Sequence, residues 1–202
     1  MNILTHCCLF SVCLFFLSCE HDKKDFRTDE SIYENGDIVF RLGDSSVSNA
    51  VMIADEYSDY SHVGIIAYDQ GIPVVIHACP DDVNTININN SIKKDRINEF
   101  FSNGNALNGA IYRINDKKKA VQAANEALRM YNEGIKFDFN FDANDTTEMY
   151  CTELIEFVFG KSGVSLSDNK RHHVNMPGIN IDDCIFISDL TSSDKLQIID
   201  SF

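Results

Sequence analysis

One cysteine of the chain has the setting of a reactive thiol. Cys151 stands where a loop rich in Asp, Asn and Thr meets the apolar run YCTELIEFVF. If this run is a helix, the thiol lies at its N-terminus. There the positive end of the helix dipole and outward-pointing N–H groups favour the thiolate and can hold an oxyanion. A buried structural cysteine is the alternative interpretation, since most free cysteines are buried.

Two histidines are candidates for the base that such a thiol requires. His62 begins the apolar run HVGIIAY, and His77 lies between Ile76 and Ala78 in a second apolar run. A neutral imidazole with a pKa near about 6.5 can take a proton from a thiol. His77 needs a partner, because burying an unpaired polar group costs on the order of 1–3 kcal/mol. The alternative is that both histidines bond only to backbone groups.

The residues between the two histidines predict a hairpin. Residues 61–68 and 73–79 are β-rich runs, and Asp69-Gln70-Gly71 between them is a turn signal. A loop of Asp69 and Gln70 would pair His62 with His77 on one face, about 5 Å apart. That is the geometry of a base and the group that orients it. A register change of one residue would instead place them on opposite faces.

The remaining elements must bring the thiol to this hairpin. Residues 117–132 form the clearest helix, with one apolar stripe, Asp116 as its N-cap and Gly134 as its C-cap. The run that starts at Tyr150 predicts a buried helix. Together these patterns predict one α+β domain over residues 36–202. Its other expected elements are strands at 38–40, 110–114 and 196–199, a helix at 45–57 and a helix near 92–101.

The N-terminus has the pattern of an export signal. Residues 1–18 contain a short apolar segment that ends in Ser18, directly before Cys19. This resembles a lipobox, so we expect residues 1–18 to be a lipoprotein signal peptide and Cys19 to be lipidated. Residues 19–35 would then be a polar tether to the membrane. A plain secretory signal and a retained anchor are the alternatives.

Composition excludes several classes of function. The chain has 202 residues and a net charge of −14, a field that repels phosphate backbones, so we expect no nucleic-acid partner. Export would leave Cys79, Cys151 and Cys184 in the folded part, an odd number that implies a free thiol. No cysteine or histidine spacing fits zinc, and Asp138, Asp142 and Asp145 do not fit an EF-hand, so we expect no metal. We expect His172 and His173 to be solvated.

The order of four motifs carries a family resemblance. GDIVF, SHVGII, VVIHA and YCTELI follow one another within residues 36–190. This order resembles the circularly permuted NlpC-like cysteine hydrolases of the YiiX/YebB branch, which are distantly similar to lecithin retinol acyltransferase. The resemblance implies a papain-like α+β fold, in which an antiparallel sheet packs against helices that include the cysteine-bearing helix. It also implies that Cys151 is the nucleophile and His62 the base.

The resemblance assigns further positions as well. His77 occupies the third polar position, where many relatives carry glutamate, so histidine is a departure from the pattern. Tyr150 and Asp37 match family positions, and we expect them to support the site rather than to react.

These observations predict an envelope lipoprotein that hydrolyses an amide or an ester through Cys151, His62 and His77, without a cofactor. Cell-wall peptides are the expected substrate, and the membrane is an expected partner through the N-terminal lipid. Two alternatives stay open. One is an amidase or acyltransferase that acts on lipids or N-acyl amides. The other is a papain-like binding module with weak or no turnover.

Overall fold

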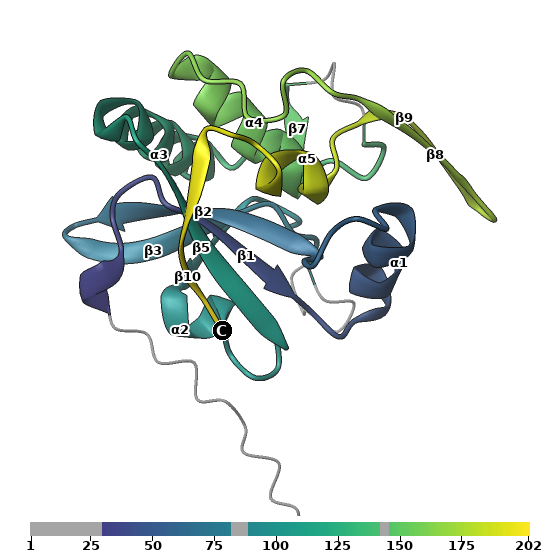
Figure 1. Cartoon of the computed structure of the whole chain (residues 1–202), viewed down its shortest axis with the longest axis horizontal. Coiled ribbons are helices and arrows are strands. Elements are labelled where there is room, and N and C mark those ends of the chain that lie inside the picture. The colour runs from purple at the N-terminus through teal and green to yellow at the C-terminus, as the bar shows by residue number, and fades with distance from the viewer. Residues whose placement is uncertain (1–29, 82–88, 142–145) are drawn as a thin grey trace, which may run out of the picture.

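A six-stranded antiparallel sheet forms the centre of the molecule (Figure 1). The computed structural model describes residues 30–81, 89–141 and 146–202. The strand order is β10-β5-β1-β2-β3-β4. Within the described part of the chain, the sheet is built from β1 (Ile38–Leu42), β2 (His62–Asp69), β3 (Ile72–His77), β4 (Lys93–Arg96), β5 (Asn108–Ile114) and β10 (Leu196–Ser201).

Helices cover both faces of this sheet (Figure 1). The long helix α3 (Lys117–Glu133) and the cysteine-bearing helix α4 (Cys151–Lys161) lie on one face, and the short helix α2 (Ile97–Phe100) lies on the other. This is the α+β arrangement that the sequence predicts. The smaller elements are η1 (Glu30–Ile32), α1 (Ser46–Ala54), β6 (Lys136–Phe137), β7 (Glu148–Met149), β8 (His172–Met176), β9 (Ile179–Cys184) and α5 (Ile187–Thr191).

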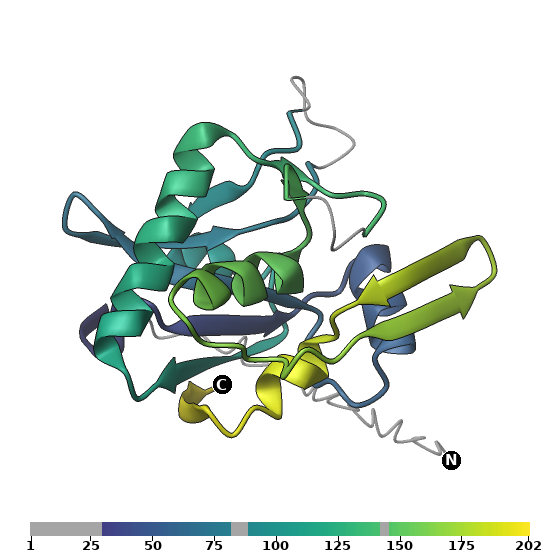
Figure 2. The same ribbon diagram turned by 90° about the horizontal axis from the view of Figure 1, so that it is seen from above.

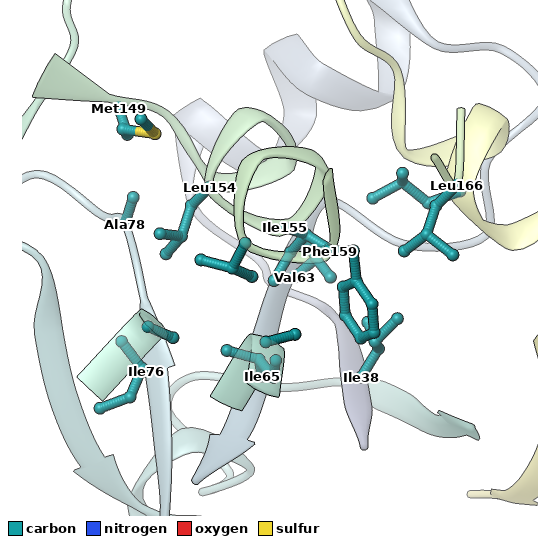
Figure 3. Close-up of a cluster of buried hydrophobic side chains, with 14 of the residues drawn as sticks. Ile38, Val63, Ile65, Ile76, Ala78, Met149, Leu154, Ile155, Phe159 and Leu166 are labelled. Atoms are coloured by element: carbon teal, nitrogen blue, oxygen red, sulfur yellow. The ribbon is translucent and has the colours of Figure 1, made fainter. Parts of the chain in front are cut away.

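The central strands β1, β2, β3 and β5 are largely buried on both sides, which explains why they read as apolar runs. In β2, Val63 and Ile65 belong to the core cluster under α3 and α4, whereas Ile66 belongs to the cluster on the α2 face. Figure 3 shows Ile155 and Phe159 of α4 packed above the strands of the first cluster. Side chains alternate along a strand, so His62, an even-numbered residue like Ile66, points to the α2 face.

The β2–β3 hairpin corrects the predicted register. Gln70 and Gly71 form the loop with φ of 51° and 81°, the left-handed values of a two-residue type I′ turn. Asp69 therefore pairs with Ile72, and Ile65 pairs with Ile76. The predicted direct pairing of His62 with His77 is wrong by two residues, so the two histidines are diagonal neighbours. Because side chains alternate with a period of two, they still share one face.

Helix α3 follows the sequence prediction closely. The Asp116 side chain accepts hydrogen bonds from the backbone N–H groups of Lys118 and Lys119, and Gly134 caps the other end with φ of 72°. Gly36 allows the turn before β1 to approach this helix. A Cβ at Gly36 would lie 2.4 Å from the carbonyl oxygen of Ala120, so a larger residue there would push the helix away.

Three segments differ from the expectation. Residues 93–96 are a strand rather than part of a helix, because they pair with β3, and the helix that follows has four residues. Strands β8 and β9 form an arm that extends from the body (Figure 2). Apolar and polar residues alternate over only three or four positions of HHVNM and INIDDC, which is too short a pattern to predict the arm. Tyr33 is 4% exposed, which places part of the expected tether in the folded body.

No helix in the described ranges is both long and apolar enough to cross a membrane. The expected signal peptide, residues 1–18, and the expected lipidation site, Cys19, lie outside the described residues.

Candidate active site

Cys151 is the first residue of helix α4 and is half-buried at the edge of the core. Burial and the neighbouring Cys79 raise the pKa of the Cys151 thiol to about 12. Hydrogen bonds from backbone N–H groups, including those of Thr152 and Val63, act in the opposite direction. The expected effect of the helix terminus is therefore present, but burial outweighs it. The prediction that the thiolate is favoured is wrong for the free protein, in which the thiol is neutral.

His62 and His77 contact each other directly. Nε2 of His62 lies 2.8 Å from Nδ1 of His77, and the two rings meet edge to face with centroids 5.0 Å apart. His77 is 1% exposed. Gly64 makes room for this pair, because a Cβ there would lie 2.5 Å from Val75 Cγ1 and 3.1 Å from His77 Cβ. The buried imidazole therefore has the partner that the sequence argument requires.

Asp95 extends the pair to a row of three side chains. Its Oδ2 lies 2.9 Å from Nε2 of His77. Strand pairing explains the contact: Asp95 lies opposite Val75, so it shares a face with His77 two residues further along β3. The sequence analysis missed Asp95, since residues 92–101 were assigned to a helix. The charged run KKDR carries no apolar signal for a strand, so only its pairing with β3 reveals the contact.

Phe100 forms the floor beneath the histidines. Its ring lies 5.8 Å from the ring of His62 and 5.2 Å from that of His77. The guanidinium of Arg41 lies over the same ring at 4.3 Å, and its Nη1 donates to the carbonyl of Phe100 at 2.6 Å. Burial, followed by the charge of Arg41, holds the pKa of His62 well below its usual range. His62 is therefore a neutral imidazole at neutral pH.

The thiol and the histidine row both lie near the start of β2. Cys151 approaches from the α4 side, where its sulfur is held by the N–H of Val63, the residue that follows His62. Within the part of the chain that the structure describes, no hydrogen bond joins the Cys151 sulfur to the imidazole of His62. Burial holds the pKa of the Cys151 thiol above its usual range and that of the His62 imidazole below it, which favours the neutral form of both groups at neutral pH.

The two residues expected to support the site both hold backbone in place. The Tyr150 hydroxyl accepts a hydrogen bond of 2.9 Å from the N–H of Ile185, which ties the start of α4 to the chain before α5. Asp37 is 1% exposed and accepts two hydrogen bonds from Arg113, at 2.6 and 2.7 Å. Asp37 thus anchors the start of β1 to β5.

An apolar groove of about 560 Å³ opens beside Cys151. One wall is helix α1, which has no buried residue, and the other is the β8–β9 arm. Phe139 and Phe141 close one side. The apolar side of helix α1 faces this groove, and two of its residues, Val51 and Ala54, also pack against the core. This side consists of Val47, Ala50, Val51 and Ala54.

The other candidates of the sequence analysis are not part of the histidine row, although Cys79 neighbours Cys151 and Cys184 lines the groove. His172 is not free in solvent as expected, because its Nε2 lies 2.8 Å from the buried carboxylate of Asp189 and its ring stacks on Phe186. Cys79 and Cys184 are free thiols. Asp138 is buried, and its proposed companions Asp142 and Asp145 lie outside the described residues.

Comparison with known proteins gives a family. Residues 32–176 match the family model described as permuted papain-like amidase enzyme, YaeF/YiiX, C92 family. The uncharacterized protein YiiX of Escherichia coli K12 is 25% identical over 132 residues, which cover 62% of this chain and 57% of that protein. The match therefore spans little more than half the length of this curated relative.

A solved structure supports the fold. The crystal structure of metalloprotein YiiX from Escherichia coli O157:H7 superimposes with a TM-score of 0.68 at 19% identity, covering 84% of this chain and 97% of that one. The term metalloprotein describes that protein. In residues 30–81, 89–141 and 146–202 of this chain, no group of three or more His, Cys, Asp or Glu side chains is placed to hold a metal ion.

Proposed function

Because this chain belongs to the permuted papain-like amidase family of YaeF and YiiX, we propose that it is a thiol amidase with Cys151 as its nucleophile. In this proposal His62 carries the proton and His77 holds His62 in place. The support from the structure is the position of Cys151 at the start of a helix, in contact with the strand that begins at His62.

The protonation states of Cys151 and His62 in the free protein determine how acylation of Cys151 would proceed. His62 uses Nε2 to contact His77, which leaves Nδ1 as the nitrogen that takes the thiol proton as sulfur attacks the carbonyl carbon. Since the resting thiol is neutral, proton transfer accompanies attack. The N–H groups at the start of α4 stabilise the oxyanion. The C–N bond then breaks, the imidazolium returns its proton to the leaving amine, and an acyl thioester remains on Cys151.

Deacylation repeats the proton transfers with water. His62 takes a proton from the attacking water molecule, and the tetrahedral intermediate collapses to a carboxylic acid. His62 then returns its proton to the sulfur of Cys151, which restores the free enzyme.

The apolar groove at Cys151 is the observation that carries the choice of substrate. We propose that the bond is an amide or ester whose acyl group is a hydrocarbon chain, because such a chain buries apolar surface against Val51, Ile181 and their neighbours. A peptide would place polar backbone groups against the same walls without partners. Hydrolysis of cell-wall peptides stays a prediction from the sequence, and the groove favours the acyl-amide alternative over it.

We also propose that the protein is exported and anchored to the envelope membrane through a lipidated Cys19. The support is the lipobox-like order of apolar segment, Ser18 and Cys19. Intact-mass analysis of the protein extracted from membranes tests this, since an unmodified Cys19 would contradict it.

The activity is tested with the soluble chain that starts after Cys19. Octanoyl p-nitroanilide or the corresponding p-nitrophenyl ester is added, and the peptide that contains Cys151 is examined for the added mass of one octanoyl group. Cys151→Ala should abolish both turnover and acylation without lowering Tm. The matched control is Cys79→Ala, which removes another half-buried free thiol. Acylation of Cys79 in place of Cys151 would contradict the proposal, and a large fall in Tm for Cys151→Ala would favour a structural cysteine.

A further inference from the structure

The fold supplies a carboxylate that the third polar position itself lacks. We propose that Asp95 is a positioning residue that acts through His77 and fixes which nitrogen of His62 faces the thiol. This inference rests on the proposed thiol amidase function for its catalytic consequence, whereas the proton arrangement can be measured independently of turnover.

The hydrogen-bonding capacity of the groups determines the order of protons in the row. An ionised carboxylate only accepts hydrogen bonds, so His77 must donate from Nε2 to Asp95 across the 2.9 Å contact. A neutral imidazole has one donor and one acceptor, which makes Nδ1 of His77 an acceptor. His62 then donates from Nε2 across the 2.8 Å contact. Its Nδ1 is left bare, with a lone pair for the thiol proton.

The surroundings keep these three groups in the charge states that the argument needs. Burial alone would raise the pKa of Asp95, but the hydrogen bond to His77 and the positive charges of Arg41 and Lys93 hold it below its usual range. Burial lowers the pKa of His77, against the opposing hydrogen bond to Asp95. The row therefore consists of one carboxylate and two neutral imidazoles at neutral pH.

The position of Asp95 also explains how histidine can serve where related enzymes use glutamate. When His62 takes the thiol proton, it becomes an imidazolium, and a neutral neighbour stabilises that charge less than a carboxylate does. Asp95 does not touch His62 but lies beyond His77 in the row. Its negative charge acts on His62 through the polarised imidazole of His77. His77, 1% exposed, separates the carboxylate from the base.

The first test reads the proton arrangement directly. Nitrogen-15 NMR of the histidine rings distinguishes protonated from bare ring nitrogens in the intact soluble protein. We expect Nε2 to be protonated and Nδ1 to be bare in both His62 and His77. In Asp95→Ala, which leaves Nε2 of His77 without its acceptor, we expect mixed protonation of both rings. A proton on Nδ1 of His62 in the wild type, or unchanged rings in Asp95→Ala, would overturn the proposal.

The second test measures the catalytic consequence against a matched control. Asp69, at the hairpin end of β2, is a carboxylate that also pairs with a side chain of β4, Lys94, at 2.7 Å. Asp95→Ala should lower kcat about ten- to 150-fold with little change in KM, the factor expected for a hydrogen bond to a charged group. Asp69→Ala should lower kcat less than threefold. Equal effects of the two substitutions would overturn the positioning role.

The pH profile separates positioning from a loss of folding. Removing the carboxylate removes the stabilisation of an imidazolium at His62, so the acid limb of kcat/KM should move to lower pH in Asp95→Ala. Asp95→Glu should restore part of the rate and move the limb back. If kcat/KM of Asp95→Ala is lower at every pH while its acid limb stays at the wild-type pH, the proposal is contradicted. If no variant or wild-type protein cleaves any amide while the NMR result holds, the proposed function fails and the proton arrangement of the row stands.

Discussion

Filling the groove should remove the proposed preference of the enzyme for long acyl chains. Ala50 lines the groove from helix α1, which contributes no buried residue, so Ala50→Trp places an indole where the chain would lie without disturbing the core. Each methylene buried adds roughly 0.8 kcal/mol, or about a fourfold gain. Six methylenes, the difference between acetyl and octanoyl, therefore add up to about 5 kcal/mol, or about three orders of magnitude in kcat/KM.

The assay compares acetyl, butyryl, hexanoyl and octanoyl p-nitroanilides. In the wild type kcat/KM should rise with each step, and in Ala50→Trp the rise should disappear while the acetyl substrate keeps its rate. Ile53→Trp is the matched control, because Ile53 lies on the same helix, is 67% exposed and does not line the groove. Equal rates for acetyl and octanoyl substrates in the wild type, or equal losses in the two tryptophan variants, would refute the assignment of the groove.

Three further predictions concern protonation and packing at the site. Since the pKa of Cys151 is raised to about 12, alkylation by iodoacetamide should accelerate about tenfold per pH unit from about pH 7 to 9, and a plateau below about pH 8.5 would contradict this. The pKa of His62 is lowered, so its contribution to stability is complete above about pH 6.5 and is lost as the pH falls, by up to about 1.4 kcal/mol per unit. Urea unfolding at several pH values gives the free energy of unfolding as a function of pH. This free energy should fall less steeply with falling pH in His62→Gln than in the wild type, and an equal dependence on pH in the two proteins would contradict the burial argument. Gly64→Ala should displace His77, costing about 1–3 kcal/mol and most of the activity, whereas Gly104→Ala, with nothing near its Cβ, should be neutral in both assays.

The sequence predicts the two histidines as neighbours because the hairpin that holds them is local. Its turn and its two apolar runs are contiguous, and a register error of two residues leaves side chains on the same face. The helix that starts at Cys151 was also predicted, since an apolar run bounded by polar residues marks it. In both cases the information lies within a short stretch of chain.

Other features depend on contacts between distant segments. Asp95 reaches His77 only because β4 pairs with β3, and residues 93–96 alone carry no apolar signal for a strand. The groove requires α1 and the β8–β9 arm to face each other, although α1 ends at Ala54 and β8 begins only at His172, and no sequence pattern links the two segments. The pKa of Cys151 was misjudged for a related reason, because burial outweighs the helix terminus and burial is a property of the whole fold.

Helix α4 belongs to the core and helix α1 lines the groove, and this difference has an evolutionary consequence. Helix α4 supplies both Cys151 and the fully buried side chains Leu154, Ile155 and Phe159, so a change that reorients the proposed nucleophile also disturbs the core. The α1 wall of the groove is less constrained, since every residue of α1 is at least partly exposed and only Val51 and Ala54 of its groove-lining residues pack against the core. Substitutions in α1 can therefore alter which acyl chains fit at little cost in stability. Relatives with this fold are free to diversify in substrate range while the chemistry at Cys151 stays the same.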